Sequence, residues 1–317
     1  MSNDLLGIHH VTAMTDDVVR NYEFFTQVLG MRLVKKTVNQ DDIHTYHTFF
    51  ADDGGNAGTD MTFFDFPGQP KGKPGTNSIY RTSFRVPSDA ALEYYKNRFE
   101  AFAVKHEDIS EVFGNKVLRF EEADGQLFQL ISDENNTGVE PGTPWKNGPV
   151  PEEYAIYGLG PIEIHVSYYE DFLTALKQIY KMKEIHKDDE FAVLEVGEGG
   201  NGARVFLYND QDSEGIEGYG EVHHVSFRVK DDAAIEEWEE RYKGMGIPNS
   251  TIIDRFYFKA LYARIGHILI EISTDGPGFA TDEPYETMGE SLALPPLLEP
   301  KREYIESQIR MFDTTIN

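Results

Sequence analysis

The chain of 317 residues contains no cysteine, which excludes disulfide bonds, thiolate metal sites and a cysteine nucleophile. Positive charge is also scarce: 29 lysine and arginine residues face 55 aspartate and glutamate residues, so the net charge is −26. Such a charge repels nucleic acids and anionic membranes, and neither is an expected partner. No apolar run approaches the roughly 20 residues that span a bilayer, and the N-terminus does not have the pattern of a signal peptide. We therefore expect a cytoplasmic protein.

The remaining composition, with 40% apolar and 26% charged residues, is typical of a globular protein. At about 150 residues per domain, the length predicts two domains. The segment 133–160 is rich in proline and glycine and is the expected linker between them. The predicted domains span residues 1–145 and 155–317, and the second ends in a loop and a helix at 301–312.

One unit recurs four times along the chain. The stretch SIYRTSFRVPSDAA at 78–91 matches EVHHVSFRVKDDAA at 221–234, GIHHVTAMTDDVVRNY at 7–22 fits the same frame, and GPIEIHVSYYEDFLTA at 160–175 fits it more weakly. These matches define modules 1 to 4, which span residues 7–70, 78–133, 161–210 and 221–275.

Each module begins with a strand of alternating residues, such as 222–229, and continues with an amphipathic helix. Three short strands follow, and the last is the most regular, at 127–132 in module 2 and 269–274 in module 4. The chain is thus predicted to be an α+β protein made of four βαβββ modules. Because one module leaves a sheet face uncovered, the modules are expected to pair into two domains.

Aligning the modules brings candidate metal ligands to equivalent positions. The first-strand position holds a basic residue in every module: His10, Arg81, His165 and His224. The last-strand position is polar in two modules, with Gln129 in module 2 and Glu271 in module 4. It is apolar in the other two, with Phe63 or Phe64 in module 1 and a position near Phe206 in module 3. Two further histidines, His44 and His47, lie three residues apart in a predicted strand, point to opposite faces and are interpreted as non-ligands.

Two histidines and one glutamate remain as a metal site. His224 and Glu271 share a module, and the third ligand is His10 or His165; we favour His10 because the IHHVT and VHHVS strands match each other best. Glu271 lies among isoleucine and leucine residues, where a carboxylate is costly unless it is paired or binds a metal. A set of two histidines and one carboxylate with open positions is typical of non-haem Fe(II) oxygenases.

The βαβββ plan, the two HH-V-[TS] strand starts and the late I-E-I strand resemble the vicinal oxygen chelate superfamily, and within it the dioxygenases that cleave the ring of hydroquinones. The likeness covers nearly the whole chain and includes GIHHVT at 7–12, DDGGNAGTDMTFFDFPG at 52–68 and DRFYFKALYARI at 254–265. It implies that the four modules pair into two vicinal-oxygen-chelate domains with open-barrel sheets.

The resemblance also implies a site. The metal ligands of the family fall on His10, His224 and Glu271, and its other catalytic residues fall on His9, Thr12, His223, Arg255 and Tyr262. His9 and His223 titrate near neutral pH in ordinary surroundings and are candidates for proton transfer. Arg255 is expected to stabilise a developing anion, and Tyr262 to hydrogen-bond a reacting oxygen.

The predicted function is cleavage of a hydroquinone- or catechol-type diol by O2, with Fe(II) as cofactor and Mn(II) or Zn(II) as alternatives. The expected partners are a small aromatic diol and O2, and a homodimer joined at strand edges stays open. Two other functions also stay open. A glyoxalase-type isomerase or lyase would use a metal without O2, and a metal-free protein that binds small aromatics would need no ligand set.

Overall fold

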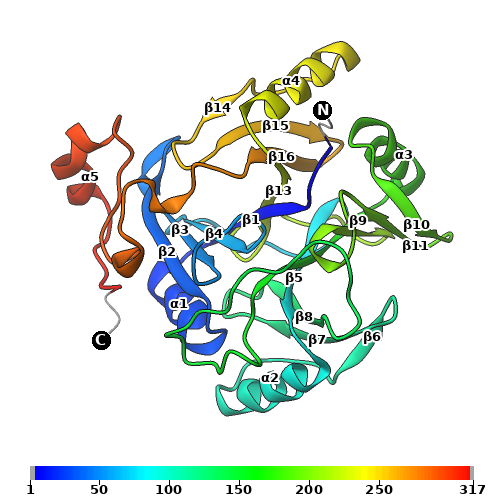
Figure 1. Cartoon of the computed structure of the whole chain (residues 1–317), viewed down its shortest axis with the longest axis horizontal. Helices are drawn as coiled ribbons and strands as arrows, with labels where there is room; N and C mark the ends of the chain where they lie inside the picture. The colour runs from blue at the N-terminus through cyan, green and yellow to red at the C-terminus, as the bar shows by residue number, and fades with distance from the viewer. Residues whose placement is uncertain (1–3, 315–317) are drawn as a thin grey trace.

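The computed structural model describes residues 4–314 and contains the four modules in chain order (Figure 1). Module 1 comprises β1 (Ile8–Thr15), α1 (Val18–Glu23), β2 (Arg32–Asn39), β3 (Asp42–Ala51) and β4 (Asp60–Asp65). Module 2 comprises β5 (Ser78–Val86), α2 (Asp89–Ala101), β6 (Ser110–Val112), β7 (Asn115–Glu121) and β8 (Leu127–Ser132). Module 3 comprises β9 (Gly158–Val166), α3 (Tyr169–Ile179), β10 (Lys183–Lys187), β11 (Phe191–Glu195) and β12 (Arg204–Asn209). Module 4 comprises β13 (Val222–Val229), α4 (Asp232–Met245), β14 (Ile253–Asp254), β15 (Lys259–Ile265) and β16 (Ile268–Thr274). The C-terminal segment adds α5 (Arg302–Gln308).

The predicted βαβββ plan is confirmed in every module. The strands expected at 222–229 and 127–132 are β13 and β8, and the strand expected at 269–274 is β16, which begins one residue earlier. The helix predicted at 301–312 is shorter, because the backbone becomes extended at Ile309 and ends α5 at Gln308. No helix within residues 4–314 is long and apolar enough to cross a membrane.

Two eight-stranded sheets form the body of the protein. The first has the order β14-β15-β16-β13-β1-β4-β3-β2 and joins modules 4 and 1; the second has the order β10-β11-β12-β9-β5-β8-β7-β6 and joins modules 3 and 2. In Figure 1 the blue strands of module 1 lie beside the yellow and orange strands of module 4. At the centre of each sheet, the first strands of two modules pair antiparallel. The α+β fold with two open sheets is therefore confirmed.

The sheets do not follow the order of the modules along the chain. Residues 1–145 and 155–317 each contribute one module to each sheet, and one hydrophobic core cluster includes buried residues of all four modules. A module leaves one edge of its first strand open, and here that edge is covered by the first strand of a module from the other half. The division into domains at 1–145 and 155–317 stays a prediction.

Side-chain caps mark where the helix begins in modules 1, 2 and 4, whereas α3 of module 3 has none. Asp231 caps α4 by accepting a hydrogen bond from the Ala234 backbone N–H, and Gly246 ends the helix in the left-handed conformation with φ of 68°. In each module the helix begins eight residues after the same first-strand position. The residues at that position are His10, Arg81, Pro161 and His224.

This correspondence corrects two parts of the sequence alignment. Module 3 places Pro161 at the first-strand position, so the alignment of His165 was wrong by four residues; the weak Ile-His-Val-Ser match was out of frame. On the last strands, Glu271 pairs with Ser226, and the same register pairs Thr62 with Thr12. The module 1 counterpart of Glu271 is therefore Thr62 rather than a phenylalanine. In modules 2 and 3 the counterparts are Gln129 and Phe206, as expected.

The C-terminal segment packs on module 1, next to β2 and β3. Its apolar side chains form a small cluster with the strands and with α1: Val18, Val38, Tyr46, Leu292, Leu294, Ile305 and Ile309. The Lys35 side chain, which has no exposed surface, forms ion pairs with Asp282 and Glu283 of this segment. The segment is thus attached to the strand that carries one wall of the pocket described below.

Candidate metal centre

Three predicted ligands meet in the middle of the first sheet, on adjacent strands. His10 lies on β1, His224 on β13 and Glu271 on β16. The Oε2 atom of Glu271 is 3.1 Å from Nε2 of His10 and 2.8 Å from Nε2 of His224, and the two Nε2 atoms are 3.3 Å apart. All three residues are buried, and they form the one group of this kind found within residues 4–314.

Glu271 carries a buried oxygen without a hydrogen-bond donor. Its Oε1 atom accepts a hydrogen bond from the Ser273 hydroxyl at 2.6 Å, whereas Oε2 has no hydrogen-bond partner. Burial raises the pKa of the carboxyl, but His10 and His224 outweigh it and hold the pKa well below the usual range. An ionised carboxylate inside a protein needs a counter-charge. A cation between Oε2 and the two imidazoles would supply it.

His9 determines which nitrogen of His10 faces Glu271. Nε2 of His9 is 3.0 Å from the Thr274 carbonyl oxygen, which only accepts, so this nitrogen carries a hydrogen. Burial lowers the pKa of His9 to about 3, so the neutral ring has an accepting Nδ1. That atom is 2.9 Å from Nδ1 of His10, which therefore donates. In the neutral form of His10, Nε2 then carries the lone pair, and it lies against Glu271 and His224.

His223 contacts the second imidazole in the same way, since its Nδ1 lies 2.8 Å from Nδ1 of His224. Burial lowers the pKa of His223 to about 4. The expectation that His9 and His223 titrate near neutral pH was wrong, because burial favours the neutral ring in both. Each instead binds the outer nitrogen of a predicted ligand, which is how proteins orient metal-binding imidazoles.

The spacing of the three atoms fits a divalent metal ion. Bonds of about 2.1 Å place neighbouring ligands of an octahedral ion about 3.0 Å apart, and the three observed separations lie around this value. Imidazole and carboxylate together suit iron, manganese and zinc. Three protein ligands on one side of an octahedral ion would leave its other coordination positions open to water, O2 or a substrate.

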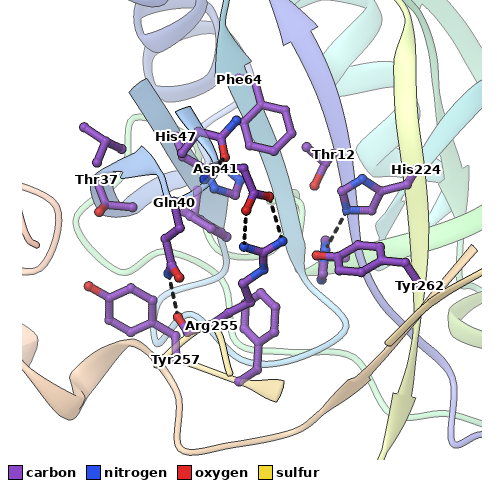
Figure 2. A pocket seen from close by; sticks show the side chains of 15 residues that line it. Thr12, Thr37, Gln40, Asp41, His47, Phe64, His224, Arg255, Tyr257 and Tyr262 are labelled. Carbon is purple, nitrogen blue, oxygen red and sulfur yellow. Dashed lines mark hydrogen bonds and ion pairs between the residues drawn. The ribbon is translucent and has the colours of Figure 1, made fainter. Parts of the chain in front are cut away.

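A pocket with aromatic walls opens beside His10 and His224 (Figure 2). Phe49, Phe64, Tyr257 and Phe258 are among its lining residues. Of the further predicted site residues, Thr12, Arg255 and Tyr262 line this pocket. His9 and His223 lie behind the predicted ligands instead. Apolar walls with a few convergent polar groups are typical of small-molecule sites.

Arg255 closes part of the pocket through a contact between modules 4 and 1. Its guanidinium binds both carboxylate oxygens of Asp41, at 3.2 and 2.9 Å, and its backbone oxygen accepts a hydrogen bond from the Gln40 side chain at 2.8 Å. Figure 2 shows these bonds between the β2–β3 turn and the segment before β15. The guanidinium also lies 5.6 Å from the centre of the Tyr262 ring. Arg255 thus faces both the pocket and the surface.

Tyr262 is positioned to donate a hydrogen bond. Tyr262 on β15 pairs with Glu271 on β16, and the ring of Tyr262 stands at right angles to that of His224. Burial and the charge of Glu271 raise the pKa of Tyr262, so its hydroxyl keeps its proton at neutral pH.

The sequence did not identify His47, which lines the pocket on the module 1 side, or Thr62 behind it. Nε2 of His47 is 2.9 Å from the Thr62 hydroxyl, which is 2.7 Å from the Thr12 hydroxyl. His47 is not among the three clustered residues, but it lines the pocket, while His44 is exposed on the other side of β3. Alternation along β3 places His47 on the same face as Phe49, a signal that could have located it.

His165 lies in the second sheet, away from the cluster. It contacts Glu163 at 3.0 Å and Asp210 at 2.8 Å, and its ring stacks on Tyr80. The structure therefore brings His10, and not His165, to Glu271.

Comparisons with known proteins agree with this architecture. The model of the glyoxalase/bleomycin resistance protein/dioxygenase superfamily matches residues 7–130. The chain is 43% identical to MhqA of Bacillus subtilis (strain 168), named as a ring-cleaving dioxygenase, over 96% of this chain and 98% of MhqA. It is 29% identical to the chlorohydroquinone/hydroquinone 1,2-dioxygenase of Sphingobium indicum over 92% of each chain. The crystal structure of a Bacillus subtilis protein named as a dioxygenase matches with a TM-score of 0.90 and 35% identity, over 98% of this chain and 99% of that one.

Proposed function

The chain belongs to the ring-cleaving dioxygenases of the glyoxalase/bleomycin resistance protein/dioxygenase superfamily, and from this premise we propose that it opens the ring of a hydroquinone-type diol with O2. His10, His224 and Glu271 would hold the metal ion that this reaction requires. The observation that supports this most is the buried Oε2 atom of Glu271, which has no hydrogen-bond donor and faces two imidazole nitrogens.

We propose Fe(II) as the metal. The donor set of two imidazoles and one carboxylate is that of non-haem Fe(II) oxygenases. When bound, the ion supplies the positive charge that ionises a phenol and the redox chemistry that O2 requires. Mn(II) or Zn(II) would fit the same donors in purified protein.

The residues of the pocket bind and orient the diol. Phe64 and Phe258 face the space beside the predicted ligands, where an aromatic ring packs between them and excludes water. The guanidinium of Arg255 stabilises negative charge that develops on the ring oxygens. Tyr262 donates its hydroxyl hydrogen, which its raised pKa retains. The Thr12 hydroxyl, held by Thr62 and His47, forms the opposite polar wall.

We propose a para-diol as substrate rather than a catechol. The Sphingobium relative, 29% identical over most of the chain, is named for hydroquinone and chlorohydroquinone. The alternative of a glyoxalase-type isomerase is disfavoured because Thr62, a neutral residue, occupies the position of a second carboxylate.

The test is aerobic O2 uptake by Fe(II)-loaded protein with hydroquinone, methylhydroquinone and catechol. We expect O2 consumption and ring-opened product with the hydroquinones. Glu271→Gln removes the charge that holds the ion and should abolish both iron retention and turnover. His165→Ala is the matched control and should leave both largely intact.

Three results would contradict the proposal. Turnover of an added substrate without O2 would indicate an isomerase or lyase. Binding of aromatics by protein that retains no metal would indicate a binding protein. Loss of iron in His165→Ala, but not in His10→Ala, would show that the wrong histidine was assigned.

A further inference from the structure

The second sheet contains a counterpart of the metal pocket with a different set of charges. The strand registers place Arg81 at the position of His224, Gln129 at that of Glu271 and Arg119 at that of Tyr262. Opposite Arg81, across the central strand pair, Glu163 occupies the position that Thr12 holds opposite His224. Pro161 replaces His10. This side of the molecule therefore presents guanidinium groups where the other presents an imidazole and a phenol.

A cavity of about 230 Å³ lies at this position. Tyr80, Arg81, Lys105, Glu107, Arg119 and Leu127 line what we term the arginine cavity. Tyr80 and Leu127 give it an apolar wall, and the two arginines supply its charged wall. Its volume exceeds that of several water molecules and is sufficient for an organic ion with one ring.

Both arginines keep hydrogen-bonding capacity at the cavity. The Nε atoms of Arg81 and Arg119 are buried and make no hydrogen bond. Arg81 is only 7% exposed; its Nη1 atom donates to the Phe128 backbone oxygen, and its Nε lies 3.3 Å from a Glu163 oxygen. Arg119 forms no ion pair within the part of the chain that the structure describes. The side chain of Arg119 also makes no hydrogen bond among the described residues, so its terminal N–H groups are available to an anion in the cavity.

The surrounding acids limit the charge of that anion to one. Glu163 is buried and is shared by Arg81 and by His165, 3.0 Å away. Glu163 itself lies outside the cavity lining, whose charged side chains are Arg81, Lys105 and Arg119 against Glu107 and Glu121, a surplus of one positive charge. At the rim, Glu121 pairs with Lys105 at 2.6 Å and Glu107 is exposed. A dianion such as phosphate would meet these carboxylates at close range, whereas a monoanion would balance the surplus.

From this arrangement we propose that the arginine cavity binds a small monocarboxylate with one ring, through Arg119 and Arg81. The site is separate from the candidate metal centre and does not depend on the proposed function. The carboxylate accepts hydrogen bonds from the guanidinium groups, and the ring packs against Tyr80 and Leu127.

Calorimetric titration with benzoate, and with benzamide as its neutral analogue, tests the proposal on the full chain. Benzoate should bind with a Kd at or below the millimolar range, and benzamide should bind at least about tenfold more weakly. Arg119→Gln should weaken benzoate binding by about tenfold or more, the usual effect of losing a charge-assisted hydrogen bond. Arg264→Gln removes the same charge from an exposed position outside the cavity and should change the Kd less than about twofold.

Benzoate could also enter the metal pocket, so the titration is repeated with Glu271→Gln. Binding should be unchanged in that variant. The proposal is overturned if benzoate does not bind at concentrations up to about 10 mM, if Arg119→Gln binds it as well as the unaltered protein does, or if binding is lost in Glu271→Gln. Arg119 is half-buried and has no ion pair among residues 4–314, so its substitution is the primary variant. Arg81→Gln would leave Glu163 buried with one fewer partner.

Discussion

At the scale of single residues, the candidate metal site depends on how each imidazole is held. The backbone carbonyl of Thr274 fixes the proton of His9, and His9 in turn fixes the proton of His10. This chain of hydrogen bonds leaves a lone pair on His10 directed at a buried carboxylate oxygen. A lone pair and a carboxylate oxygen that face each other at 3.1 Å repel unless a metal ion or a proton lies between them.

Asp41 should influence turnover while contributing little to stability. Its carboxylate is 71% exposed and binds the Arg255 guanidinium through both oxygens, which holds that group at the pocket. We expect Asp41→Asn to lower kcat/KM by about tenfold and to change the free energy of unfolding by less than about 1 kcal/mol. Steady-state kinetics and urea unfolding measure the two effects. Asp42→Asn removes the same charge from the next residue, and an equal loss of kcat/KM there would contradict the role of the ion pair.

Glu221 should make stability depend on pH. Burial raises the pKa of its carboxyl to about 8, against the opposing charge of Lys71, while the unfolded chain has an ordinary pKa. The folded state therefore binds the proton more tightly, so this group's contribution is complete at about pH 4 and is lost as the pH rises to 8. The slope is about 1.4 kcal/mol per pH unit between these values.

Glu221→Gln mimics the protonated side chain and should flatten this dependence. Unfolding free energies measured between about pH 5 and 8 should show that the variant is more stable than the unaltered protein at pH 8 and similar at pH 5. The exposed Glu217→Gln serves as the control. A variant curve that runs parallel to that of the unaltered protein would show that Glu221 is already ionised in the folded state.

At the scale of elements, local patterns predicted the strands and helices well, because alternation and helical spacing are local properties. The strand at 222–229 and the helix containing Trp238 and Tyr242 are examples. The register in which neighbouring strands pair was predicted less accurately from the sequence. Thr62, not Phe63 or Phe64, is the counterpart of Glu271, and a shift of one residue changes the face on which a side chain lies.

The attachment of the C-terminal segment to β2 should support the pocket wall. Lys35 is fully buried and pairs with Asp282 and Glu283, and Asp282 also accepts a hydrogen bond at 2.8 Å from Tyr257, which lines the pocket. Lys35→Met leaves two carboxylates without their cation and should destabilise this contact by about 3 kcal/mol. We expect faster proteolysis within 276–300 and a higher KM.

Lys36→Met is the matched control, because the Lys36 ammonium reaches the Phe312 backbone oxygen instead of these acids. Limited proteolysis and steady-state kinetics compare the two variants. Equal behaviour of both would show that the ion pairs of Lys35 do not hold the segment.

At the scale of the whole molecule, the pocket is built from opposite ends of the chain. Module 1 supplies His10, His47 and Asp41, and module 4 supplies the remaining predicted ligands and Arg255. The matching histidine doublets of modules 1 and 4 predicted that His10 and His224 contribute to one site. The sequence could not predict Asp41, which has no local motif and whose partner, Arg255, lies in module 4. His47 was missed although strand alternation places it on the same face as Phe49.

Separated halves of the chain should not retain the metal. Residues 1–145 contain His10, and residues 155–317 contain His224 and Glu271, so neither half has the complete set. We expect each half alone to bind no Fe(II) with high affinity, and the two co-expressed halves to recover iron binding, because each sheet is completed only by both. Metal analysis of the purified fragments measures this. Full iron content in one half alone would contradict the shared site.

The central claim is that one metal ion is bound by Nε2 of His10, Nε2 of His224 and a carboxylate oxygen of Glu271. Crystals grown anaerobically with Fe(II), with diffraction measured on both sides of the iron absorption edge, test it most directly. We expect one strong anomalous peak within bonding distance of all three atoms. A peak beside His165, Glu163 and Asp210, or none in the first sheet at full iron loading, would contradict it.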